Sequence, residues 1–185
     1  MAHISNIGAG IFSDITVASA EVTDLSLFNT EAEFVAVFSG IKVLDTDFVR
    51  IPNIRTFPSI GTPANIVKVA EYGSKISKQV QGQADAPNLE LVINYVPSVW
   101  ASTSLLGGMV GDGKMHAFRF TLLNSELDGA NDWQSDATGI GAVANTEYYW
   151  VGKIEALVAS PQLTDSNTAT ITLSTQTDFY GAFTV

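Results

Sequence analysis

Alternation between apolar and polar residues recurs in short segments along this chain. It is clearest in Leu89–Tyr95, and it returns in Asn65–Tyr72 and in Met115–Leu123. Side chains of a β-strand point alternately to opposite faces of a sheet, so each segment predicts a half-buried strand. The pattern therefore indicates a mainly β fold. In the last segment, one face carries Phe118, Phe120 and Leu122, and the other carries Arg119 and Thr121.

The longest alternating segments lie in the last third of the chain. Glu147–Pro161 and Asn167–Thr177 are joined by a short polar stretch with a turn at Leu163–Asp165, which predicts a long β-hairpin. We expect one face of the first strand to hold Trp150, Ile154, Ala156 and Val158. On the return strand, apolar Ala169, Ile171 and Leu173 oppose a hydroxyl face of Thr168, Thr170, Thr172 and Ser174. We expect that hydroxyl face to meet water or a molecule that must not adhere.

The beginning of the chain has weaker periodicity. Residues 1–47 predict an extended N-terminal arm with short strands at Glu33–Phe38 and Ile41–Leu44. Phe48–Ile54 predicts a further strand, and Pro52 inside it indicates an edge or an end of a sheet because proline cannot donate a backbone hydrogen bond.

One helix and two long loops complete the expected elements. Ser98 can cap a helix over Val99–Val110, which Gly111 would end. Gly73–Ala86 is polar and predicts a protruding loop or hairpin. Residues 124–146 hold four acids and no base, and they predict a long acidic surface loop.

Composition narrows the possible functions. At 185 residues the chain fits a single domain, 1–185, and its 46% hydrophobic residues exclude a disordered chain. A formal net charge of −10 argues against ordinary binding to nucleic acid, which needs basic residues against phosphate. Cysteine is absent, which excludes disulfides and thiolate metal sites. We recognise neither a secretory signal nor a membrane helix, and therefore expect synthesis in a cytoplasm.

The sharpest motif is Gly108–Lys114, which has the spacing of a phosphate-binding loop up to its lysine. Met115 replaces the Ser or Thr that would hold magnesium, and the segment follows a helix and precedes a strand, the reverse of the required order. We therefore interpret it as a turn after a helix.

Other candidate chemistry is weaker still. We interpret His116 as a histidine on a sheet surface, with a Ser–His–Asp arrangement as the alternative. Asp45 with Asp47, and Asp128 with Asn131 and Asp132, could ligate calcium, but neither group fits an EF-hand loop, and solvated acidic loops are favoured. Glu90 and Glu155 are interpreted as lining a polar sheet face rather than as an acid–base pair. We predict no catalytic, cofactor-binding or metal site, and a protein that is not an enzyme.

The order of elements resembles the major tail tube proteins of long-tailed, siphovirus-like bacteriophages. The resemblance rests on a strand ending in Asn94–Pro97, a Leu-rich helix at Leu105–Val110, an aromatic strand at Phe118–Leu123 and the hairpin Tyr149–Ser174. It extends from about Phe48 to Thr177, and it leaves out the N-terminal arm and the aromatic C-terminal segment Asp178–Val185.

The resemblance implies a β-sandwich or rolled β-barrel with one flanking α-helix. It also implies a structural protein of the virion tail that assembles into stacked hexameric rings around a channel for DNA ejection. Contractile-tail and type VI secretion tubes share this architecture. Six copies would carry six times −10, about −60 per ring, and acids on the inner wall would keep DNA from adhering.

The resemblance also suggests roles for individual residues. The expected channel-facing residues are Glu90, Asn94, Glu155, Thr170 and Thr172. The expected contact between rings is the loop with Lys75, Ile76, Ser77, Lys78, Gln79 and Gln81. Expected partners are further copies of the chain, a tape measure protein and tail-terminator or tail-tip proteins, with DNA passing transiently and no membrane. Assembly would take place in the host cytoplasm.

Two other classes of protein remain as alternatives. A secreted or surface β-sandwich that acts as a binding or fibre subunit would share the same strand pattern. An enzyme ranks third because the sequence offers no convergent set of catalytic residues.

Overall fold

The computed structural model describes residues 13–38, 48–61, 66–69, 72–73, 76, 78–82, 87–122 and 146–184. Its strands are β1 (Ser13–Glu21), β2 (Phe48–Arg50), β3 (Ile54–Thr56), β4 (Ile66–Val69), β5 (Lys78–Gln81), β6 (Asn88–Asn94), β7 (His116–Leu122), β8 (Thr146–Ser160), β9 (Thr168–Thr175) and β10 (Tyr180–Thr184). Its helices are the short 3-10 turn η1 (Leu25–Leu27), α2 (Glu31–Phe38) and α3 (Leu105–Met109).

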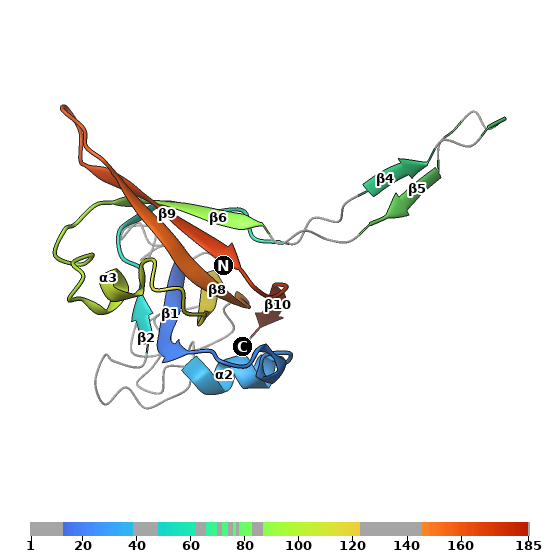
Figure 1. Cartoon of the computed structure of the whole chain (residues 1–185), viewed down its shortest axis with the longest axis horizontal. Coiled ribbons are helices and arrows are strands. Elements are labelled where there is room, and N and C mark those ends of the chain that lie inside the picture. The colour runs from blue at the N-terminus through green and yellow to red at the C-terminus, as the bar shows by residue number, and fades with distance from the viewer. Residues whose placement is uncertain are drawn as a thin grey trace.

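Eight strands form one antiparallel sheet in the order β2-β1-β7-β8-β9-β6-β3, with β10 paired to β8. The sheet curls into a half-barrel (Figure 1). The expected mainly β fold is confirmed, in the form of a rolled sheet. Strands β4 and β5 form a separate two-stranded hairpin that projects away from this body.

The main core lies on one face of the sheet, which we call the core face. Alternate residues of β1, β6, β7, β8 and β9 meet there, and Phe118 stacks on Trp150 with ring centroids 5.3 Å apart. Trp100, Leu106 and Met109 from α3 and the turn before it close one side. This is the burial that alternation in the strand segments predicts.

A second core lies on the opposite face of the same sheet, beneath α2. Phe34 and Phe38 of α2 pack against Tyr149 of β8, with ring centroids 5.4 Å and 6.0 Å away. Arg119 and Thr121 of β7 point to this side and are buried as well, so both faces of β7 are covered.

The predicted strand at Glu33–Phe38 is wrong, because these residues form α2. The apolar pair Phe34 and Phe38 has the i, i+4 spacing of one helical face, which the interpretation as a strand overlooked. Glu33 also reaches back to accept hydrogen bonds from the backbone N–H groups of Asn29 and Thr30, at 2.7 Å and 2.8 Å. These contacts lower the pKa of Glu33 and satisfy N–H groups at the start of the helix.

Two further expectations need correction. Ser13–Glu21, within the expected arm, is an interior strand between β2 and β7. The predicted helix over Val99–Val110 is only Leu105–Met109, and its N-cap is Ser104, whose hydroxyl accepts from Gly107 N at 3.0 Å, not Ser98. The described residues thus hold two α-helices where one was expected.

Other expectations are confirmed in part. Phe48–Ile54 is not one strand, because it supplies β2 and the start of β3, but both strands lie at edges of the sheet, as Pro52 indicates. The strand in Asn65–Tyr72 is β4, and the protruding segment is a hairpin with β5 as its return strand. Ile41–Leu44, Asp45, Asp47 and the loop 124–145 lie outside the described residues.

Candidate functional site

One half of the face opposite the main core carries no helix in the described part of the chain, and its side chains are mostly polar. We call it the polar face. It is formed by β6, β9 and the second half of β8, whose backbones pair in register. Its residues are Asn88, Glu90, Val92 and Asn94 of β6; Thr168, Thr170, Thr172 and Ser174 of β9; and Lys153, Glu155, Ala156, Val158 and Ser160 of β8.

The structure brings the five predicted channel-facing residues together on this face. Glu90 pairs with Thr172 and Asn94 pairs with Thr168, with Thr170 between them on β9. Glu155 joins from β8, where its Oε1 accepts a hydrogen bond of 2.5 Å from the Ser174 hydroxyl. The shared face is a property of the fold; that it lines a channel stays a prediction.

The predicted faces of β8 are correct only for its first half. The register shifts between Ile154, which pairs with Leu173, and Ala156, which pairs with Thr172, so Glu155 is an extra residue in the strand. A bulge of this kind reverses the alternation beyond it. Leu157 therefore packs on the main core, while Val158 is 58% exposed. We had predicted that Ala156 and Val158 share a face with Trp150 and Ile154. That prediction is wrong, because the bulge places Ala156 and Val158 on the opposite face.

The charge of the polar face is small. Glu90 and Glu155 are its acids and Lys153 is its base, so its formal charge is two negative charges plus one positive charge, or −1. The other groups are hydroxyls, amides and the three aliphatic side chains of Val92, Ala156 and Val158. The polar face is hydroxyl-rich rather than strongly acidic.

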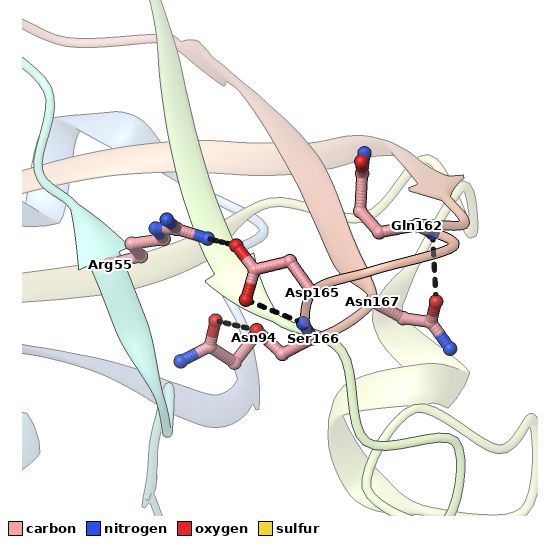
Figure 2. A network of polar contacts seen from close by, with 6 residues as sticks. All are labelled: Arg55, Asn94, Gln162, Asp165, Ser166 and Asn167. Carbon is pink, nitrogen blue, oxygen red and sulfur yellow. Dashed lines mark hydrogen bonds and ion pairs between the residues drawn. The ribbon is translucent and has the colours of Figure 1, made fainter.

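A polar network holds the end of the β8–β9 hairpin against the neighbouring strands (Figure 2). Asp165 Oδ2 lies 3.6 Å from Arg55 Nη1 of β3, and Ser166 Oγ donates to Asn94 Oδ1 of β6 at 3.3 Å. The turn is closed by Gln162 N, which donates to Asn167 Oδ1 at 2.9 Å. The ion pair is exposed and contributes little energy by itself. Together these contacts fix the orientation of the hairpin relative to β6.

Both sides of the polar face end in strand edges that have no described partner strand. β7 pairs with β8 only from Thr146 to Gly152, so the stretch Glu155–Ser160 has β9 alone beside it. β3 pairs with β6 only at Val92 and Ile93, so Asn88–Leu91 has no described strand partner on that side; Pro58–Gly61 lines a pocket beside Asn88–Glu90. Unpaired strand edges are templates for pairing with another chain.

Two of the candidate chemical groups found by sequence lie among the described residues of β7 and of the turn before it. His116 is buried, 2% exposed, because β7 is covered on both faces; the expectation of a sheet-surface histidine is wrong. The segment Gly108–Lys114 runs from the end of α3 through a turn in which Gly111 and Gly113 have positive φ angles of 69° and 76°. Within the described ranges, no group of three or more His, Cys, Asp or Glu side chains could hold a metal ion.

The described part of the chain holds no helix that is long and apolar enough to cross a membrane. The expected acidic loop and its aspartates cannot be located among the described residues, since 123–145 lie outside them. Sequence reasoning missed the latter part of the polar face on β8 because nothing in the sequence marks the bulge at Glu155.

Comparisons with known proteins give structural likeness only. No family model matches the chain, and no curated protein matches it in sequence. A chain from the sheath/tube terminator of the PVC extracellular contractile injection system, in its extended state, matches with a TM-score of 0.50 and 9% identity over 92% of this chain and 94% of that one. A subunit of the SPP1 tail tube matches with a TM-score of 0.50 and 12% identity over 92% of this chain and 77% of that one. The chain thus has a tail-tube-like fold.

Proposed function

We propose that this chain is the structural subunit of a tail tube, in a bacteriophage or in a related contractile injection system. In this proposal six copies form a ring, rings stack into a hollow tube, and the polar face of β6, β9 and β8 lines the channel. One observation supports the proposal most strongly. The chain has a tail-tube-like fold in which a hydroxyl-rich face of the sheet is flanked on both sides by strand edges without a described partner strand.

The two open edges suggest how a ring would close. The Glu155–Ser160 edge of one copy would pair with the Asn88–Leu91 edge of the next. These are different surfaces, so the contact is heterologous, and such contacts close into rings when the rotation between copies allows it. Pairing would join the polar faces of neighbouring copies into one continuous wall and would satisfy the backbone groups of both edges.

The wall formed in this way would repel DNA only weakly. Six polar faces at −1 each would carry about −6, whereas six whole chains would carry about −60. Hydroxyl groups offer DNA phosphates no concentration of positive charge, so a passing polyanion would have little to bind. We thus refine the expected acidic wall to a nearly neutral, hydroxyl-rich wall.

The β4–β5 hairpin is the proposed contact between stacked rings. Val67 and Val80 pair across it, and Val69 with its partner Lys78 shares their face; Val67, Val80 and Val69 are 49%, 53% and 48% exposed. An isolated two-stranded hairpin is marginally stable in water. An apolar face on a hairpin that projects from the body would be stabilised by packing on a copy in the adjacent ring (Figure 1). The predicted residues Gln79 and Ile76 are exposed on the same hairpin segment.

The remaining partners follow from the same proposal. A tube needs proteins that set its length and close its ends, so we retain a tape measure protein and terminator or tip proteins as partners. The proposed location is the virion tail, after assembly in the host cytoplasm. We propose no enzymatic activity.

Negative-stain electron microscopy and sedimentation of the full chain at rising concentration test this function. We expect rings and tubes from the wild-type chain, and a loss of tubes in Val80→Asp, which charges the apolar hairpin face. Leu27→Asp is the matched control, since it adds the same charge at an exposed aliphatic residue outside the hairpin. Monomers at every concentration, or equal loss of tubes in both variants, would contradict the proposal.

A further inference from the structure

A cleft of about 470 Å³ lies between the end of β1, α3 and the turn Gly111–Lys114. Its wall includes Ser19, Glu21, Ser104, Asp112, Lys114 and His116. His116 is 2% exposed, and it lies at the start of β7, where β1 and β8 flank it in the sheet. The proposed function gives this cleft no role.

The two ring nitrogens of His116 have different surroundings. Nδ1 lies 3.0 Å from the backbone oxygen of Ala18, which can only accept, so Nδ1 carries a hydrogen. In a neutral ring Nε2 is then an acceptor, and it has no hydrogen-bond partner within the described residues. The carboxylate oxygen Oδ2 of Asp112 lies 3.7 Å from Nε2. Two acceptors therefore face each other unless Nε2 takes up a proton, which turns the contact into an attractive ion pair.

Asp112 belongs to a turn that also contacts β8. Its Oδ1 accepts from the backbone N–H of Lys114 at 2.9 Å. The adjacent Gly111 donates its N–H to the backbone oxygen of Ile154 at 2.8 Å. Ile154 immediately precedes the bulge at Glu155, where the open edge of β8 begins. The turn thus connects His116 to the strand edge that the proposed ring would use.

We propose that His116 and Asp112 form a proton-operated latch that holds this turn on β8. With a proton on Nε2 the turn is held closed and the start of the open edge is ordered; without the proton the contact repels and the turn loosens. One consequence of the latch rests on the proposed function: if the chain forms rings, the latch makes ring assembly easier at lower pH.

Among the charged groups around the imidazole ring of His116, Asp112 has the largest influence on whether Nε2 holds a proton. Glu21 of β1, paired with His116 in the sheet, favours a proton on Nε2, and Lys114 of the turn opposes it. These two lie 3.7 Å apart and offset each other. α3 contributes only uncharged residues to the described wall of the cleft.

Hydrogen exchange of the full chain, measured by mass spectrometry on a peptide that contains Gly111, tests the latch without any need for assembly. The exchange is followed from about pH 5 to about pH 8, the range in which histidine changes charge, and is corrected for the intrinsic pH dependence of amide exchange. We expect protection of the Gly111 amide to fall about tenfold as pH rises, the effect of losing one charge-assisted hydrogen bond.

Asp112→Asn is the decisive variant, since its amide can donate to unprotonated Nε2 while its oxygen still accepts from Lys114 N. We expect the fall in protection with rising pH to be lost in this variant, because asparagine has no negative charge to pair with a protonated Nε2 and its amide can donate only to the unprotonated ring. Asp178→Asn removes an exposed charge elsewhere and should behave as the wild type. Protection that does not change with pH in the wild type, or that changes equally in Asp112→Asn, would overturn the latch.

Assembly of the same samples separates the two proposals. Tubes that form more readily near pH 5 than near pH 8 in the wild type, but show no such preference for pH 5 in Asp112→Asn, support a latch that controls assembly. Tubes whose yield is the same at every pH would overturn that control and leave the tube function intact. A chain that forms no tubes at any pH contradicts the tube function, while the exchange data still decide whether the latch exists.

Discussion

The hydroxyl of Ser174 donates a hydrogen bond of 2.5 Å to Oε1 of Glu155, the extra residue at the bulge of β8. This contact holds a carboxylate beside the hydroxyl row of β9. The bulge also reverses the faces of the residues that follow, so an aliphatic residue, Val158, becomes part of the polar face while Leu157 enters the core.

The reversed faces of β8 predict opposite outcomes for two neighbouring substitutions. Leu157→Asp places a charge against the main core and should lower the free energy of unfolding by about 2–4 kcal/mol. Val158→Asp places the same charge on an exposed position and should change it by less than about 0.5 kcal/mol. Urea denaturation of the unassembled chain measures both. A regular strand without the bulge would give the reverse order, and that order would contradict this register.

The buried ion pair beneath α2 predicts a large loss of stability when its cation is removed. Arg119 Nη1 lies 3.8 Å from Glu147 Oε1, and the Arg119 guanidinium carbon lies 5.1 Å from the centre of the Phe38 ring. Arg119→Met leaves Glu147 buried without a cation and should lower the free energy of unfolding by about 3–5 kcal/mol.

Two controls accompany that substitution. Arg55→Met breaks the exposed pair with Asp165 and should cost less than about 1 kcal/mol. Adding Glu147→Leu to Arg119→Met removes the unpaired charge and should restore most of the loss. If Arg119→Met were no more destabilising than Arg55→Met, the buried pair would not have the role described here.

Alkaline pH should weaken the fold through Tyr149. Burial, together with the adjacent Glu147 carboxylate that accepts from its hydroxyl, raises the pKa of Tyr149. An unfolded tyrosine loses its proton near pH 10, whereas the folded chain keeps it, so the folded state binds more protons above that pH. Stability is therefore fully present below about pH 10 and falls as pH rises further.

The comparison that checks this uses the free energy of unfolding at about pH 9 and about pH 11, on either side of the tyrosine value. Tyr149→Phe should lose less stability over this interval than the wild type. Tyr72→Phe, at an exposed position on the hairpin segment, is the matched control and should follow the wild type. An equal loss in Tyr149→Phe and wild type would show that Tyr149 does not carry the effect.

Alternation was enough to find the strands that build the polar face. Leu89–Tyr95 and Asn167–Thr177 have uninterrupted patterns, and both are strands with the expected faces. Glu33–Phe38 was misassigned because a short apolar segment fits both the two-residue period of a strand and the 3.6-residue period of a helix. The helix is stabilised by the hydrogen bonds from Asn29 and Thr30 to Glu33 and by packing of Phe34 on Tyr149.

Other features depend on partners distant in sequence. The burial of His116 and Arg119 follows from coverage of both faces of β7, which no local pattern reveals. The bulge at Glu155 depends on the register between β8 and β9. Four of the five channel-facing candidates share a face because β6 and β9 pair where the alternation of each strand is in phase, and Glu155 joins them as the extra residue in β8.

Cryo-electron microscopy of the assembled chain tests the central claim most directly. A helical reconstruction should yield a hollow tube in which Glu90, Thr170 and Thr172 face the channel and the Glu155–Ser160 edge of one copy pairs with the Asn88–Leu91 edge of its neighbour. A tube whose channel is lined by another surface of the chain, with the polar face outside or buried between copies, would contradict the account.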